Sequence, residues 1–146
     1  MRTKEFLGKL EHERIVQAIR EAESKTSGEI RIFLQRGLLA DDPVEAAGKK
    51  FHALGMHKTA ARNGVLIFIA PRAHKFAVIG DAGIHEKCGE ALWQGVVGKM
   101  RQHFQQEHFT DAIVEAVSDL GSVLAEQFPR QPGDKNELPD AIIEEE

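Results

Sequence analysis

Two short polar motifs flank the apolar runs in the middle of this 146-residue chain, and they hold the residues best suited to chemistry. Arg62-Asn63 comes directly before the run Gly64–Ala70, and Gly80-Asp81 ends the run Lys75–Gly80. A guanidinium beside a carboxylate forms a charge-assisted ion pair, and carboxylate, amide and main-chain oxygens are the ligands that Ca²⁺ prefers. These residue types indicate either a structural ion pair or a cation site.

The strands that must position these motifs follow from hydrophobic patterning. Ile30, Ile32 and Leu34 alternate with polar or mixed residues, which predicts a strand with one apolar face. Val65–Ala70 is apolar throughout, which is typical of a central strand covered on both faces. The four residues 71–74 separate it from the next β-rich run and contain a proline, so we expect a hairpin.

Helices are predicted between and after these strands. Asp42 is a capping residue, Pro43 suits the first helical position, Glu45 completes a capping box, and Gly55 marks the end of this helix. Apolar residues at helical spacing predict three further helices, over residues 11–26, 89–106 and 110–127.

This order of elements predicts a three-layer α/β/α sandwich around a small mixed central sheet of three or four strands. The first two strands are expected to be parallel, with a right-handed crossover, and the third antiparallel. A fourth short strand is expected within Gly37–Ala40. We predict one domain over residues 1–128 and an acidic, partly mobile tail over residues 129–146, with Ala141-Ile142-Ile143 docking on the body.

The predicted strand directions bring distant polar residues to one sheet edge. The first two strands begin at this edge and the third ends there, so the expected ligand-binding residues are Glu29, Arg62, Asn63, Asp81 and Gly83. The carboxylates of Glu29, Asp81 and Glu86 are the expected ligands of a divalent cation, Ca²⁺ or Mg²⁺. Three interpretations stay open: a structural clamp of Arg62 on two carboxylates, a cation or ligand site, and a catalytic site. No catalytic residue is assigned.

Charge, apolar runs and cysteine content exclude several classes of function. Six acidic residues and two basic ones follow Phe128, so the tail carries the whole net charge of −4 and the remainder is neutral, which argues against nucleic acid as a partner. No apolar run approaches the ~20 residues of a membrane span, and no signal peptide is visible, so a cytoplasmic protein without membrane insertion is expected. Cys88 is the single cysteine, and the five-residue histidine spacings fit no zinc motif, so neither a disulfide, a catalytic thiol nor zinc is favoured.

Several motifs in order resemble the TPM-domain family: "SGEIRIFL", "ARNGVLIFIA", "FAVIGDAGI" and "FTDAI", within residues 10–128. The stretches "LGMHKTAARNGVLIFIA" and "NELPD" are similar to a short cytosolic branch without signal peptide or membrane anchor. Where other branches have Gly-Tyr-Gly-Leu-Glu, this chain has Gly80-Asp81-Ala82-Gly83-Ile84, which lacks the aromatic residue and adds a carboxylate. The resemblance implies a small sheet between helices, with calcium binding in some members and acid phosphatase activity in others.

The predicted function is a binding module whose sheet-edge polar site takes a divalent cation or a protein partner. The alternative is a metal-dependent phosphatase that hydrolyses phosphomonoesters, with Asp81 as nucleophile or base and Arg62 holding the phosphate. A scaffold that presents the last two helices to other proteins ranks below both.

Overall fold

A four-stranded mixed sheet forms the middle layer of the computed structural model, which describes residues 2–130 and 142–144. Its strand order is β3-β2-β1-β4, with β1 at Glu29–Leu34, β2 at Gly64–Ala70, β3 at Lys75–Gly80 and β4 at Ile142–Glu144. β1 and β2 are parallel, and the hairpin makes β3 antiparallel to β2, as the sequence predicts.

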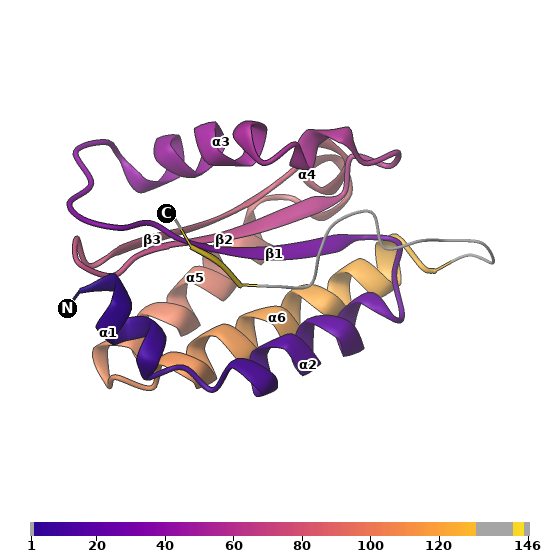
Figure 1. Ribbon diagram of the computed structural model, residues 1–146. Helices are drawn as coiled ribbons and strands as arrows, with labels where there is room; N and C mark the ends of the chain where they lie inside the picture. The colour runs from indigo at the N-terminus through magenta and orange to yellow at the C-terminus, as the bar shows by residue number, and fades with distance from the viewer. Residues whose placement is uncertain (1, 131–141, 145–146) are drawn as a thin grey trace.

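Helices cover both faces of this sheet, which confirms the predicted α/β/α sandwich. The helix α3 packs on one face, while α2, α5 and α6 lie on the other (Figure 1). The helical elements are α1 at Thr3–Gly8, α2 at His12–Glu23, α3 at Pro43–Ala53, a 3₁₀ turn at Met56–Lys58, α4 at Ala82–Cys88, α5 at Glu90–Gln105 and α6 at Phe109–Gln127.

Each face of the sheet has its own hydrophobic core, and β1 shows how the alternation divides them. Ile30 and Ile32 are fully buried in the larger core with α2, α5 and α6, whereas Phe33 points to the smaller core under α3. Burying one such side chain contributes about 1.5–3 kcal/mol. The side chain of Glu29 therefore projects from the α3 face of the sheet, the same face as Phe33.

The start and end of α3 follow from the capping residues seen in the sequence. The carboxylate of Asp42 accepts hydrogen bonds from the backbone N–H groups of Val44 and Glu45, at 3.1 and 3.2 Å. Gly55 follows the helix with a left-handed φ of 72°, a conformation that glycine adopts without steric cost. These local signals fix the crossover that carries the chain from β1 to β2.

The structure corrects several expectations about the smaller elements. Gly37–Ala40 forms no strand, and the fourth strand is instead β4, which pairs in parallel with β1. Ile142 packs against the larger core, in line with the predicted docking of the tail, whereas residues 131–141 and 145–146 lie outside the described part of the chain. Two short helices that the hydrophobic patterning did not predict are α4, after β3, and α1, near the N-terminus.

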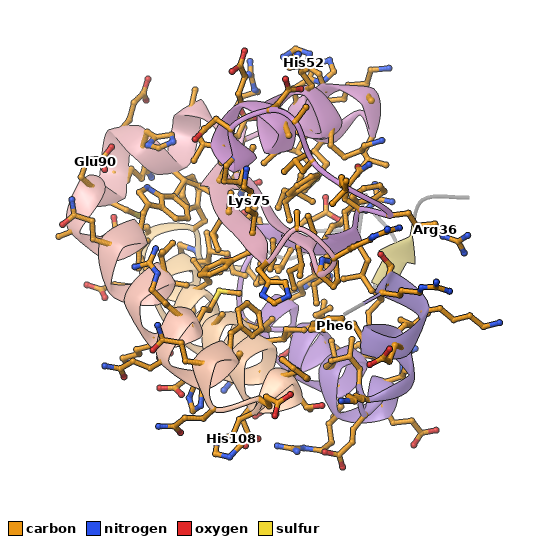
Figure 2. The ribbon with its side chains drawn as sticks, turned by 90° about the vertical axis from the view of Figure 1, so that its left-hand side faces the viewer. Phe6, Arg36, His52, Lys75, Glu90 and His108 are labelled. Carbon is orange, nitrogen blue, oxygen red and sulfur yellow. The ribbon has the colours of Figure 1, made fainter. Side chains whose placement is uncertain are left out.

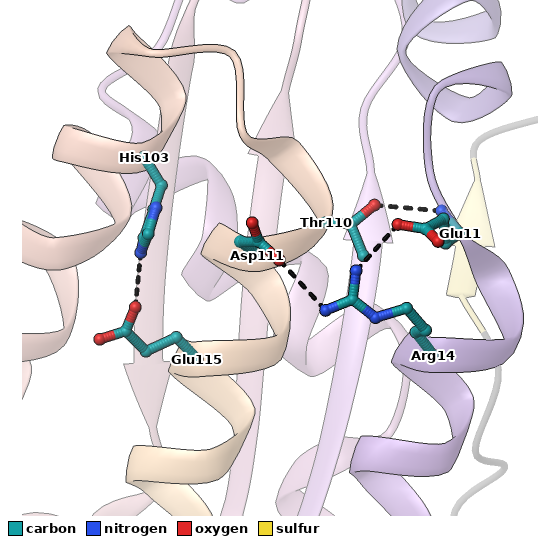
Figure 3. Close-up of polar contacts among 6 residues, drawn as sticks. All are labelled: Glu11, Arg14, His103, Thr110, Asp111 and Glu115. Atoms are coloured by element: carbon teal, nitrogen blue, oxygen red, sulfur yellow. Dashed lines mark hydrogen bonds and ion pairs between the residues drawn. The ribbon is translucent and has the colours of Figure 1, made fainter.

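Polar contacts between helix surfaces join α6 to α2 and to α5 (Figure 3). Arg14 donates hydrogen bonds to Glu11 at 2.8 Å and to Asp111 at 3.1 Å, and His103 contacts Glu115 at 2.5 Å. The side chains of Arg14 and Asp111 are about half exposed, and such pairs contribute roughly 0–1 kcal/mol each. The helices are therefore held mainly by their apolar stripes.

The turn after α5 gives a test of backbone strain. Glu107 has a left-handed φ of 60° in a turn where His108 N–H bonds to the His103 carbonyl at 2.9 Å, a helix end at which glycine is usual. Glu107→Gly is expected to raise the free energy of unfolding by about 0.5–1 kcal/mol because it removes the steric cost of this conformation. Urea unfolding measures the change. Glu107→Ala is the matched control, and equal stability of the two variants would contradict the assignment of strain.

Candidate functional site

The predicted site residues lie where β1 and β2 begin and β3 ends. Strand register places Glu29 beside Gly64, and the Asp81 N–H donates to the Gly64 carbonyl at 3.0 Å. Glu29, Gly64 and Asp81 thus form one row across three neighbouring chain segments. By the alternation of the strands, both acidic side chains project from the α3 face, with the side-chain-free Gly64 between them.

The central interaction of this edge is a two-point ion pair between Arg62 and Asp81. Arg62 Nε donates to one carboxylate oxygen at 2.7 Å and Nη2 donates to the other at 2.8 Å. The Asp81 side chain is 6% exposed, whereas that of Arg62 is 52% exposed. The pair therefore presents a fixed guanidinium to solvent and keeps the carboxylate behind it.

Asp81 remains ionised in this setting. Burial by itself raises the pKa of its carboxyl group, but the hydrogen bonds from Arg62 and from the Ala82 backbone N–H, with the nearby positive charges, outweigh it. The net result is a pKa below the usual value for aspartate. Its contact with Ala82 also places the negative charge at the N-terminus of α4, where it is favourable.

The backbone of Arg62 is strained, and close packing holds it in this conformation. Arg62 has a left-handed φ of 52°, which is unusual for a residue with a side chain, and its carbonyl accepts the Gly83 N–H at 2.9 Å. A Cβ at Gly83 would lie 2.4 Å from the Ala61 carbonyl oxygen and 2.7 Å from that of Arg62. Because Gly83 has no side chain, α4 can approach this loop closely. The role of Gly83 is therefore to shape the backbone.

Asn63 is 1% exposed and ties the loop to the neighbouring chain. Its side-chain amide donates to Ser27 Oγ at 3.1 Å, its N–H donates to Thr59 Oγ1 at 3.3 Å, and its carbonyl accepts the Glu29 N–H at 3.4 Å. These contacts assign Asn63 a positioning role at the start of β1 and β2.

The three carboxylates predicted as cation ligands have different surroundings. Glu29 is 2% exposed, and its charge raises the pKa of Arg31, although burial of that guanidinium lowers it by more. Asp81 is engaged by Arg62, and Glu86 lies exposed on α4. Within residues 2–130 and 142–144, no group of three or more His, Cys, Asp or Glu side chains could hold a metal ion. The assignment of Glu29, Asp81 and Glu86 as cation ligands therefore stays a prediction.

His57 is a neighbour of this edge that the sequence did not single out. Its ring stacks on that of His52 with centroids 4.2 Å apart, and burial, then the positive charges of His52, Lys58 and Arg62, lower its pKa. Its Nδ1 is buried and has no hydrogen-bond partner in the described part of the chain. His57 thus brings a buried imidazole nitrogen close to this edge, in the 3₁₀ turn Met56–Lys58, which the sequence did not predict.

Cys88 carries no sign of nucleophilic activation. The thiol is half-buried at the end of α4, and burial raises its pKa despite the nearby charge of Lys87. A raised pKa keeps the less reactive thiol form.

Comparison with known proteins identifies the family of this chain. The sequence pattern of the TPM domain matches residues 1–123, which covers most of the chain. The chain therefore belongs to the TPM-domain family, as the motifs suggested. No functionally curated protein matches it.

Two solved structures support the assignment of the fold. The BA42 protein of the psychrophilic bacterium Bizionia argentinensis is 35% identical, with a TM-score of 0.84 and 92% of each chain covered. The N-terminal domain of the cg2496 protein of Corynebacterium glutamicum is 16% identical, with a TM-score of 0.60, 76% of this chain and 69% of that chain covered, and it supports the fold alone. In the described part of this chain, no helix has the length and apolar character to cross a bilayer.

The lowered pKa of Asp81 predicts a pH-dependent contribution to stability. Asp81→Ala is expected to reduce the free energy of unfolding at neutral pH by about 1–2 kcal/mol, through loss of charge-assisted hydrogen bonds and of the α4 cap. A carboxyl group whose pKa is lower in the folded state stabilises it fully above the unfolded pKa, about 3.9, and loses this effect as the pH falls through the folded pKa. Urea unfolding at about pH 7 and about pH 3 checks this. A difference between the two chains that persists undiminished at the lower pH would refute it.

Gly83 allows a separate test of the loop geometry. Gly83→Ala is expected to destabilise the fold by about 1–3 kcal/mol because the new Cβ meets two carbonyl oxygens of the Arg62 loop. Gly98→Ala in α5 is the matched control: no heavy atom lies within 4 Å of a Cβ there, so a gain of up to about 1 kcal/mol is expected. Thermal unfolding of both variants gives the comparison. Equal effects of the two substitutions would exclude the close approach at Gly83.

Proposed function

We propose that this TPM-domain protein is a binding module and that its ligand site is the polar sheet edge around Arg62 and Asp81. The observation that carries the proposal is the Arg62–Asp81 pair itself, a half-exposed guanidinium held at two points on a buried carboxylate. The backbone of Arg62 is strained, and such conformations persist where the surrounding structure enforces them, often at ligand sites.

A divalent cation is the first ligand supported by this arrangement. The carboxylates of Glu29 and Asp81 project from the same face on either side of Gly64, and hard cations take such oxygens. Arg62 already neutralises Asp81, so a cation must displace the guanidinium from at least one carboxylate oxygen. The cation therefore competes with an internal positive charge.

A protein partner is the second ligand, and it would use the other side of the same pair. Nε and one N–H of Nη2 point to Asp81, which leaves the remaining guanidinium donors of Arg62 available at the surface. A carboxylate of a partner matches these donors. A cation therefore requires Arg62 to move away from Asp81, whereas a partner carboxylate requires Arg62 to stay in place.

Phosphomonoester hydrolysis is the alternative function, and the geometry favours it less. Asp81 accepts hydrogen bonds from Arg62 and from Ala82, and its lowered pKa makes it a weak base. The test is hydrolysis of p-nitrophenyl phosphate by the purified chain and by Asp81→Asn and Glu29→Gln. A rate unaffected by both substitutions would assign the activity to a contaminant.

Calcium and magnesium titration of the labelled protein, followed by amide NMR shifts, tests the proposed site. We expect saturable shifts at Asn63, Gly64 and Asp81, and a loss of affinity of about tenfold or more in Glu29→Gln and Asp81→Asn because each removes a charged ligand. Glu86→Gln tests the third predicted ligand. Glu126→Gln, an exposed acid on α6, is the matched control and should bind as the natural chain does.

Arg62→Gln separates the two ligand classes. If a cation is the ligand, this substitution strengthens binding, since the competing guanidinium is gone. If a protein carboxylate is the ligand, the same substitution abolishes capture of the partner while Glu126→Gln retains it. The absence of saturable cation binding, together with partner capture that Arg62→Gln leaves intact, would reject this edge as the ligand site.

A further inference from the structure

A cavity of about 520 Å³ lies at the opposite edge of the sheet from Arg62 and Asp81. It opens between α1, the β2–β3 hairpin, the end of α5 and the start of α6, at the end of the molecule that faces the viewer in Figure 2, where Phe6 and Lys75 are labelled. β2 ends here at Ala70, and open α/β sheets commonly bind ligands outside the carboxyl ends of their parallel strands. The volume is within the range of small-molecule sites.

The wall of this cavity is aromatic. Phe6, Phe76, Phe104 and Phe109 come from four different elements and contact one another, with ring centroids 4.9 Å apart for Phe6 and Phe109 and 5.0 Å apart for Phe76 and Phe104. Phe6 is buried, whereas the other three rings are only partly covered. The partly covered rings offer an apolar surface to the body of a ligand.

The rim of the cavity carries an excess of positive charge. Lys75 and Arg101 are exposed, and neither forms an ion pair with any residue that the structure describes. The guanidinium carbon of Arg101 lies 6.0 Å from the ring centroid of Phe76, at the boundary between the charged and the aromatic parts. Among the described residues, Glu107 is the one acidic residue on the lining. An anionic group above the rings would meet two cations.

Two rim residues have left-handed backbones at positions where glycine is usual. His74 has a φ of 56° and closes the hairpin turn through its N–H bond to the Pro71 carbonyl at 3.1 Å, and Glu107 has a φ of 60° after α5. Among the described residues, the other non-glycine residue with positive φ is Arg62. The chain thus keeps side chains at two strained positions on this rim, a pattern associated with functional sites.

We propose that this cavity binds a small organic anion with an apolar body, an acyl or aryl carboxylate. The apolar body lies against the phenylalanine rings, and Lys75 and Arg101 hold the carboxylate. This site is separate from the Arg62–Asp81 edge, because the two lie at opposite ends of β2.

Titration with octanoate, followed by amide NMR shifts of the full chain, tests the proposal. We expect saturable shifts concentrated at Phe76, Arg101 and Glu107, and none with octylamine, which has the same chain length and the opposite charge. A parallel titration with 3-phenylpropionate shows whether an aryl body binds as well as an acyl one. Shifts from octylamine equal to those from octanoate, or no saturable binding of either carboxylate, would overturn the proposal.

Charge variants give a second test, because they are expected to change octanoate affinity in opposite directions. Loss of structure would only weaken binding. Lys75→Gln and Arg101→Gln should each weaken octanoate binding about three- to tenfold, whereas Glu107→Gln should strengthen it about threefold, since it removes a repulsive charge. Lys25→Gln, an exposed lysine just after α2 and outside the cavity lining, is the matched control and should change nothing. Effects of the same sign at Lys75 and Glu107, or unchanged affinity in all variants, would refute the charge assignment.

Discussion

The register between β1 and β2 is the constraint on which the polar edge depends. This pairing places Glu29 beside Gly64, and the hairpin to β3 then brings Asp81 to the other side of Gly64. Arg62 and Asp81 are 19 residues apart in the chain, yet their side chains meet at 2.7 Å because Arg62 lies just before the start of β2 and Asp81 just after the end of β3, at the same edge. A shift of one residue in either pairing would turn one acidic side chain to the opposite face of the sheet.

The sequence was sufficient for this part of the fold because its signals are local or topological. Alternation in β1, continuous apolar character in β2 and the cap at Asp42 each specify an element without reference to distant residues. Strand direction follows from the connections: a helical crossover gives parallel strands and a short turn gives antiparallel ones. The meeting of Arg62 with Asp81 could therefore be predicted, although the choice between a clamp and a ligand site could not.

The elements that sequence patterning missed owe their structure to tertiary contacts. α4 has only seven residues, and it is held by the Asp81 cap and by the burial of Ile84 in the larger core. β4 is a strand of three residues that exists because an edge of β1 accepts it, and no such partner serves Gly37–Ala40. His57 lies in the short 3₁₀ turn after α3, and its buried Nδ1 depends on packing that a linear pattern does not encode.

The two ends of the sheet differ in what a ligand must displace. At one end Asp81 already pairs with Arg62, so a cation would have to displace the guanidinium from at least one carboxylate oxygen before binding there. At the other end Lys75 and Arg101 have no ion-pair partner among the described residues, so the proposed anion would break no ion pair there. For the proposed cation, binding at the Arg62–Asp81 edge would therefore be an exchange, with an affinity reduced by the cost of opening the pair. The aromatic cavity, by contrast, is already formed, so the proposed anion would bind without opening an internal ion pair.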